Sequence, residues 1–249
     1  MAVRFSYDTG MMEVGRYHGA PINVCWSFLL AAVVLSFPFW KAVNGTGLVL
    51  ALIFAGVLFA SIVLHELAHA AVGRRYRVPS KRIDIHIFGG VVHFMWRPQT
   101  AAQDAAITVA GPLSNLALGL VAFGLLAVVS ALEPGAVAGA PPEPSGILAR
   151  ALRATAYLNI GLCVINLIPA FPLDGGRLAH LAIAQVWTRR TATMIVASLG
   201  LVFATFSTLL FFATAISGFP ILAPPGFRAN WAALRAARSG IGDWDAAVA

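Results

Sequence analysis

The sequence predicts an all-α polytopic membrane protein with about five to six transmembrane helices and a small membrane-associated β-hairpin. Of its 249 residues, 59% are hydrophobic and only 11% are charged, whereas a soluble domain is about 25% charged. Long apolar segments follow one another along the chain, and roughly 20 apolar residues are enough to cross a bilayer as a helix. These observations exclude a soluble globular protein.

Five apolar segments account for the predicted helices, at residues 22–40, 48–72, 105–132, 151–186 and 194–216. The dipeptide Asn44-Gly45 is typical of a turn and separates the first two. Residues 133–146 are rich in Pro, Gly and Ala and are predicted to form an extramembrane loop. Prolines and glycines interrupt the fourth segment, which predicts a broken helix. Near the end, residues 219–225 are too short and proline-rich to span, and residues 229–238 are predicted to form a short surface helix.

This organisation corresponds to one membrane domain, residues 1–217, and a C-terminal tail, residues 218–249. The length leaves no room for a regulatory module of about 100 residues. The net charge of +7 is explained by basic loops at a membrane surface, so no nucleic-acid partner is predicted. The two isolated cysteines form no disulfide framework.

The distribution of basic residues predicts the orientation in the membrane. Lys and Arg cluster between the second and third segments, whereas residues 133–146 contain neither. Basic loops face the cytoplasm, so the N-terminus and the end of the second helix are predicted to be cytoplasmic. The tail is less simple, because Arg228, Arg235 and Arg238 would then lie outside. Either the tail folds back along the membrane surface or the number of spans near residues 219–225 is different.

The segment between the second and third helices contains a predicted β-hairpin. Isoleucines at positions 83, 85 and 87 alternate with Asp84 and His86, and a second β-like run follows Gly89-Gly90. Two interpretations of this hairpin are open. Either its edge strand binds and clamps an extended peptide, or the hairpin is only a membrane-surface element. The candidate clamping residues are Gly89, Gly90 and Val91.

The most informative motif lies inside the second apolar segment, where His65-Glu66-Leu67-Ala68-His69 follows the pattern His-Glu-x-x-His. Residues i and i+4 share one face of a helix, so both imidazoles can bind one metal ion. Glu66 is then placed to act as general base on a metal-bound water. On a soluble helix the motif is often only a solvated face. At membrane depth, however, unpaired ionisable groups are costly, and the metal-binding interpretation is favoured.

Two histidines do not complete a catalytic zinc site, which usually has three protein ligands and one water. Asp174 is the only carboxylate in the fourth segment and stands beside the proline and glycine break. Irregular backbone at membrane depth is tolerated where it lines a cavity or water, which makes Asp174 a candidate third ligand. The alternative is that Asp174 caps the helix that starts near Gly175.

Together these motifs resemble the site-2 protease family of intramembrane zinc metalloproteases, in the form without regulatory nucleotide-binding domains. The resemblance rests on His65-Glu66-x-x-His69 and on the run NLIPAFPLDGGR at 166–177. It also includes AGPLSN at 110–115, which is expected to open the third helix, and FGGV at 88–91. The resemblance extends over residues 25–208 and implies a catalytic core at about residues 48–187. The resemblance implies one Zn²⁺ per chain, bound by His65, His69 and Asp174, with Glu66 as catalytic base and Asn166 holding the substrate or the oxyanion.

The resemblance also implies an activity. The enzyme would hydrolyse a peptide bond in or near a transmembrane segment of a membrane-anchored substrate, with a zinc-activated water as nucleophile. An anti-sigma factor or another membrane-anchored regulator is the kind of partner expected, and the site would open toward the cytoplasm. Many family members have a sixth helix or cytoplasmic nucleotide-binding domains, which this sequence does not show.

Other function classes explain the sequence less well. A di-iron bundle needs a second Glu-x-x-His, but Glu133 and Glu143 both lie in the predicted loop. A transporter would have two related halves with paired broken helices. A membrane protein that only binds zinc would not need Glu66. The other polar groups receive simpler assignments, with His86 and His93 on a solvated face of the hairpin and Arg177 at the membrane interface.

Overall fold

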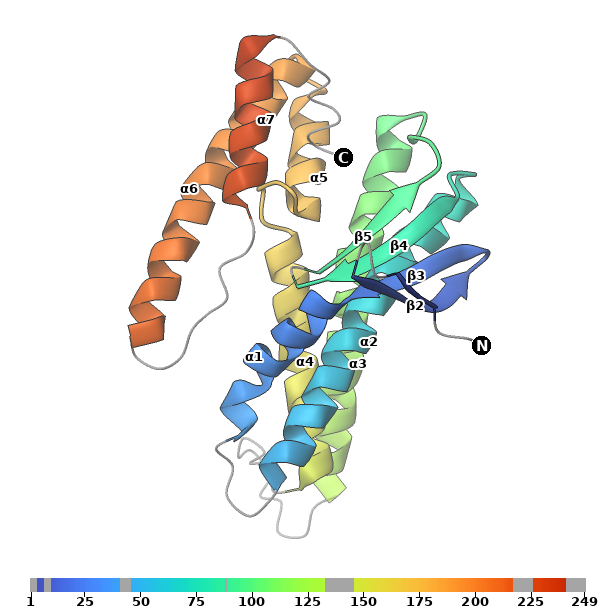
Figure 1. The fold of residues 1–249 in the computed structure, drawn as a ribbon, viewed down its shortest axis with the longest axis vertical. Helices are drawn as coiled ribbons and strands as arrows, with labels where there is room; N and C mark the ends of the chain where they lie inside the picture. Colours follow the sequence, from blue (N-terminus) through green and yellow to red (C-terminus); the bar gives the residue numbers. More distant parts are fainter. Residues whose placement is uncertain are drawn as a thin grey trace. The chain divides into compact units, whose positions relative to one another are not determined.

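A computed structural model describes residues 4–6, 10–40, 46–87, 89–132, 146–216 and 226–240 (Figure 1). Among these residues, four helices are long and apolar enough to cross a membrane, and residues 26–36 form a shorter apolar helix. The helical fold with a small sheet is as predicted, and the chain is a multi-pass membrane protein. It divides into two compact units, Met1–Arg97 with Ala110–Cys163 and Pro98–Val109 with Val164–Ala249, and each is described by itself.

The first unit contains four helices, α1 (Trp26–Trp40), α2 (Thr46–Arg75), most of α3 (Ala101–Leu132) and most of α4 (Ile147–Asn166). Aromatic and polar contacts join them. The Phe28 and Phe59 rings join α1 to α2 with centroids 5.6 Å apart, and the Phe123 and Tyr157 rings join α3 to α4 at 5.4 Å. The buried amide of Asn159 on α4 donates a 3.0 Å hydrogen bond to Ser61 Oγ on α2. Because interhelical hydrogen bonds fix helix register in an apolar environment, α4 is held against the helix that carries the His-Glu-x-x-His motif.

A five-stranded sheet completes this unit, in the order β1 (Arg4–Ser6), β2 (Met11–Tyr17), β3 (Ala20–Cys25), β4 (Ser80–His86) and β5 (Gly89–Phe94). Strands β3 and β4 are parallel and the other neighbours are antiparallel. The predicted hairpin is therefore correct, as β4 and β5, but it belongs to a larger sheet. The first apolar segment was predicted to be helical from residue 22. Residues 20–25 instead form β3, and α1 begins only at Trp26.

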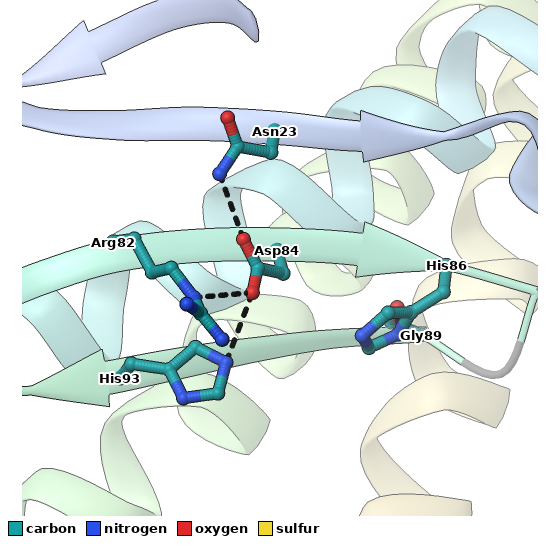
Figure 2. A network of polar contacts seen from close by, with 6 residues as sticks. All are labelled: Asn23, Arg82, Asp84, His86, Gly89 and His93. Atoms are coloured by element: carbon teal, nitrogen blue, oxygen red, sulfur yellow. Dashed lines mark hydrogen bonds and ion pairs between the residues drawn. The ribbon is translucent and has the colours of Figure 1, made fainter. Parts of the chain in front are cut away.

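Residues 83–85 of β4 are buried on both faces of the strand, for different reasons. Ile83 and Ile85 pack into a core with Leu58 and Ala70 of α2. On the opposite face, the carboxylate of Asp84 is only 1% exposed and accepts three hydrogen bonds (Figure 2). Asn23 Nδ2 donates to Oδ1 at 2.8 Å, and Arg82 Nε and His93 Nε2 lie 2.7 and 3.0 Å from Oδ2. This network ties β3, β4 and β5 together, so His93 has a structural contact as well as its partial exposure to solvent.

The second unit contains α5 (Asp174–Ile183), α6 (Arg189–Ile216) and α7 (Phe227–Ser239). The break predicted in the fourth apolar segment lies between Asn166, the last residue of α4, and Asp174, the first of α5. Phe171 from this break is buried with Val196 and Ala197 of α6 and with Ala233 and Leu234 of α7. The predicted short C-terminal helix is thus present, and its apolar face packs on α6. Most of the predicted loop at 133–146, and residues 219–225, lie outside the described residues.

Candidate metal centre

The two histidines of the motif meet on one face of α2. His65 and His69 are 6% and 8% exposed, and their Nε2 atoms lie 3.1 Å apart. The rings meet edge to face, with centroids 4.8 Å apart. This is the arrangement predicted from the i, i+4 spacing, with both Nε2 atoms converging on one point.

The surroundings of the two nitrogens fit a metal ion. Two imidazoles bound to a tetrahedral zinc at 2.0–2.1 Å have their nitrogens about 3.3 Å apart, close to the observed separation. Gly111 of α3 keeps the adjacent space open. A Cβ atom at this position would lie 2.5 Å from His65 Nε2 and 2.5 Å from His69 Cε1. The missing side chain leaves a cradle beside both donor atoms, so the residues present are suited to hold zinc.

Glu66 is buried next to these histidines, with 4% exposure, and it adjoins the start of β5. A Cβ atom on Gly90 would lie 2.5 Å from Glu66 Oε1 and 2.6 Å from Cδ. The structure therefore brings the candidate base and one of the three candidate clamping residues into direct proximity. Gly89, the preceding residue, has φ of 121°, a conformation that L side chains rarely adopt.

The AGPLSN run lies inside α3, which begins at Ala101, so the expectation that this run opens the helix is wrong. The helix already starts at Ala101, where Gln103 N donates to Thr100 Oγ1 and Gln99 N donates to Gln103 Oε1, and Pro112 is accommodated within the helix. The packing roles of Gly90 and Gly111 were missed in the sequence. Their only signal was a glycine inside a predicted strand or helix, which indicates a close approach without naming the neighbour.

Asp174 is the first residue of α5, in the second unit. The N-cap position itself is occupied by Leu173, so the alternative role of Asp174 as N-cap is not observed. The two following glycines permit close packing on the broken segment. A Cβ on Gly175 would lie 2.5 Å from Ile168 O, and one on Gly176 would lie 2.6 Å from Ala170 O. These contacts fix the start of α5, and with it Asp174, on residues 167–173.

Two further predicted residues flank Asp174 in sequence. Asn166 is the last residue of α4, before the break. Arg177, predicted at the membrane interface, forms a 2.8 Å ion pair with Asp104 of α3. The histidines and Asp174 belong to different compact units, and their joint binding of zinc is part of the proposal below.

Comparison with known proteins identifies the class. The model of peptidase family M50 matches residues 53–143 and 142–207, and the chain belongs to this family. A Synechocystis protein whose name assigns it provisionally to the zinc metalloproteases is 32% identical over 194 residues, covering 75% of this chain and 48% of the relative. A zinc metalloprotease of Methanocaldococcus jannaschii is 31% identical over 182 residues, covering 73% and 48%.

A solved structure agrees with this assignment. The site-2 protease from Methanocaldococcus jannaschii superposes with a TM-score of 0.57 at 27% identity, covering 82% of this chain and 86% of that one. The resemblance noted from the motifs is therefore confirmed at the level of family and fold. The chain spans about half the length of the curated relatives it matches.

Proposed function

We propose that this protein is an intramembrane zinc metalloendopeptidase that hydrolyses a peptide bond in or near a transmembrane segment of a membrane-anchored protein. The observation that carries the proposal is the buried cluster of His65, Glu66 and His69, with Gly111 leaving space at both Nε2 atoms. A structural helix in a membrane has no need of three ionisable groups. Membership of family M50 and the fold of a site-2 protease support the same chemistry.

In this proposal His65, His69 and Asp174 bind one Zn²⁺ per chain. When bound, zinc lowers the pKa of a coordinated water toward about 7 and polarises the substrate carbonyl. These three side chains would supply the number of protein ligands that catalytic zinc sites usually have. A carboxylate and two neutral imidazoles are a donor set that suits zinc.

Glu66 acts as the general base and then as the general acid. It accepts a proton from the attacking water and returns it to the leaving amine as the peptide bond breaks. Its burial beside the histidines keeps it near the reacting atoms. Asn166 is proposed to donate a hydrogen bond to the oxyanion of the carbonyl.

Strand β5 is proposed to hold the substrate in an extended form. It is the last strand in the order of the sheet among the described residues, so its outer edge is available for pairing. Gly90, near the start of β5, lies directly beside the Glu66 carboxylate. A transmembrane helix hides its peptide groups, and pairing with a strand edge would expose one of them while satisfying its neighbours. Gly89, Gly90 and Val91 would form the contact nearest to the base.

The substrate is proposed to be a membrane-anchored regulator, such as an anti-sigma factor, processed by regulated intramembrane proteolysis. Entry of water favours a site near one membrane surface. His65 and His69 lie in the second half of α2, which ends at Arg74 and Arg75. By the positive-inside rule this end is cytoplasmic, and the site is proposed to open to that side.

Zinc analysis and cleavage measured together test this function. The wild-type protein should contain about one zinc per chain and should cleave a helical membrane substrate. His65→Ala, His69→Ala and Asp174→Ala should each release zinc. Glu66→Gln should keep zinc yet lose cleavage, because it removes the base and not a ligand. Zinc content unchanged in Asp174→Ala would exclude Asp174 as a ligand, and cleavage by Glu66→Gln would exclude this mechanism.

A further inference from the structure

We propose that Asn230 of α7 is a positioning residue for Asp174, holding the broken segment on which this carboxylate is mounted. The inference rests on the proposed role of Asp174 as a zinc ligand. Helix α7 (Phe227–Ser239) lies beyond residues 53–207, which the family model matches. The C-terminal helix would then be part of the metal-binding apparatus, although it contributes no ligand.

Asn230 makes a reciprocal contact with the backbone of Phe171. Its side chain is fully buried, with 0% exposure. Asn230 Nδ2 donates to Phe171 O at 2.6 Å, and Asn230 Oδ1 accepts from Phe171 N at 3.1 Å. The same Nδ2 also donates to Gly226 O at 2.6 Å, which ties the amide to the start of its own helix. Both backbone polar groups of Phe171 are therefore paired with one side chain.

The need for this pairing arises from the break. Buried backbone groups that have lost helical partners must be paired, at a cost of about 1–3 kcal/mol for each one left unpaired. A carboxamide is suited to the task because it offers a donor and an acceptor in the geometry of a peptide group. A leucine or an alanine at position 230 would satisfy neither group of Phe171.

Helix α6 is shaped to admit this amide. Gly200 of α6 faces Asn230, and a Cβ atom at position 200 would lie 2.7 Å from Asn230 Nδ2 and closer still to Oδ1. Val196 and Ala197, one turn earlier on α6, pack on the Phe171 side chain. The side chain and the backbone of Phe171 are thus both held, one by apolar packing and the other by Asn230.

Local backbone hydrogen bonds and close contacts link Phe171 to Asp174. Leu173 N donates to Ala170 O at 2.9 Å, and Gly176 N donates to Leu173 O at 3.0 Å. A Cβ on Gly176 would lie 2.9 Å from Phe171 N, so the first turn of α5 rests directly on the residue that Asn230 holds. Since only two residues separate Phe171 from Asp174, a shift of Phe171 must move the carboxylate.

Zinc release provides a test that does not depend on activity. Residues that orient metal ligands typically contribute 10–100-fold to metal affinity. We expect Asn230→Leu, which keeps the volume but loses the hydrogen bonds, to transfer zinc to a coloured chelator at least about tenfold faster than wild type. The visible spectrum of the Co²⁺-substituted protein should also change, because it reports the geometry of the ligands.

A matched control separates positioning from general stability of α7. Arg190 Nε of α6 donates to Ala237 O at 2.7 Å, at the other end of α7. Arg190→Met should loosen this end and lower the unfolding temperature, while zinc release and the Co²⁺ spectrum stay as in wild type. The zinc release rate of Asn230→Asp, which keeps an acceptor for Phe171 N, should lie between those of wild type and Asn230→Leu. This variant replaces Asn230→Leu in the test if the leucine variant does not fold.

Coupling with Gly200 gives an independent measurement. Gly200→Ala should speed zinc release by displacing the Asn230 amide, and it should add little in an Asn230→Ala background, where the clash is gone. Additive effects would contradict the inference, as would normal zinc release in folded Asn230→Leu. Asp174→Ala serves as the reference variant. If Asp174→Ala releases zinc and Asn230→Leu does not, only the positioning role of Asn230 fails. If Asp174→Ala retains zinc, the assignment of Asp174 as a ligand fails.

Discussion

At the scale of single residues, Gly111 sets how much space remains beside the two histidines. We expect Gly111→Ala to lower zinc content, because a methyl group would lie 2.5 Å from His65 Nε2. Overpacking of this kind costs about 1–3 kcal/mol, which corresponds to roughly 5- to 150-fold in affinity if it falls on the metal-bound state. Metal analysis of purified protein measures the effect. Gly124→Ala on the same helix has no atom within 4 Å of the new Cβ and is the matched control. Equal zinc content in Gly111→Ala and Gly124→Ala would show that the open space at Gly111 is not needed for zinc binding.

His93 gives a pH-dependent prediction. Burial lowers the pKa of His93 and the positive charge of Arg82 lowers it further, while Asp84 only partly offsets them. In the unfolded chain His93 takes up a proton at about pH 6.5, whereas in the folded sheet it does so only at lower pH. Because the unfolded chain then binds more protons, the stability of the fold that is present above about pH 6.5 is lost as the pH falls. Unfolding temperatures measured from about pH 7.5 down to about 5.5 should fall less for His93→Gln than for wild type. An equal decline in both would rule out His93 as the cause.

The sequence anticipated some of these residues and not others. His65 and His69 were predicted because helical spacing alone brings i and i+4 together, and Glu66 because it stands next to the first histidine in the motif. Asp174 was selected as the only carboxylate beside a break at membrane depth. Gly111 and Asn230 were not predicted as partners of the site, since their roles depend on contacts between segments far apart in sequence. Asn230 stands in a predicted surface helix that contains several arginines, where an asparagine carries no signal of burial.

At the scale of elements, β5 is the strand whose edge can be tested. His86 and Gly89 pair across a two-residue loop, and such a closing pair exchanges hydrogen bonds. Antiparallel alternation then directs the N–H groups of Gly90 and Val92 away from β4. Val92→Pro should remove an outward donor and lower cleavage more than tenfold, about 1.4 kcal/mol in transition-state stabilisation. Val92→Thr, which keeps the donor, should cleave nearly as wild type.

Zinc content is the companion measurement for this strand. It should survive in Val92→Pro, because none of the proposed ligands lies on β5. Full cleavage by folded, zinc-loaded Val92→Pro would reduce the hairpin to a membrane-surface element. Ile85 is unsuitable for the same experiment, because it lies on the inner strand β4 and is fully buried. Proline there would disrupt the sheet and its core together.

The elements themselves were predicted unevenly. Long apolar helices and the β4–β5 hairpin follow from composition and local alternation. Strands β1 to β3 were missed because their residues mix polar and apolar types without a clear period. Of the three, only β3 pairs with a distant segment, β4. The start of α1 was misplaced because residues 22–25, three apolar residues and Asn23, continue into the apolar helix and are equally compatible with a membrane helix and with a buried strand.

At the scale of the whole molecule, the charge distribution and the sheet agree on topology. Strands β3 and β4 pair, so the entry to α1 and the exit from α2 lie on the same side of the membrane. A cysteine introduced near Arg75 should react with an impermeant reagent only from the cytoplasm, and one near Gly139 only from outside. Labelling of inside-out and right-side-out vesicles makes the comparison. The reversed pattern would overturn the proposed cytoplasmic opening of the site.

The parallel pairing of β3 with β4 also has a consequence for biogenesis. Asn23 and Asp84 are 61 positions apart and hydrogen-bonded, and the chain between them goes through both α1 and α2. During synthesis β3 must therefore wait for its partner until the second membrane helix has left the ribosome. Edge strand β5 emerges later still, so the sheet can be completed only after the helix with the histidines has been made. The proposed substrate clamp can therefore form only after α2 has been made, and Asp174, the proposed third zinc ligand, is synthesised later again, after α3 and α4.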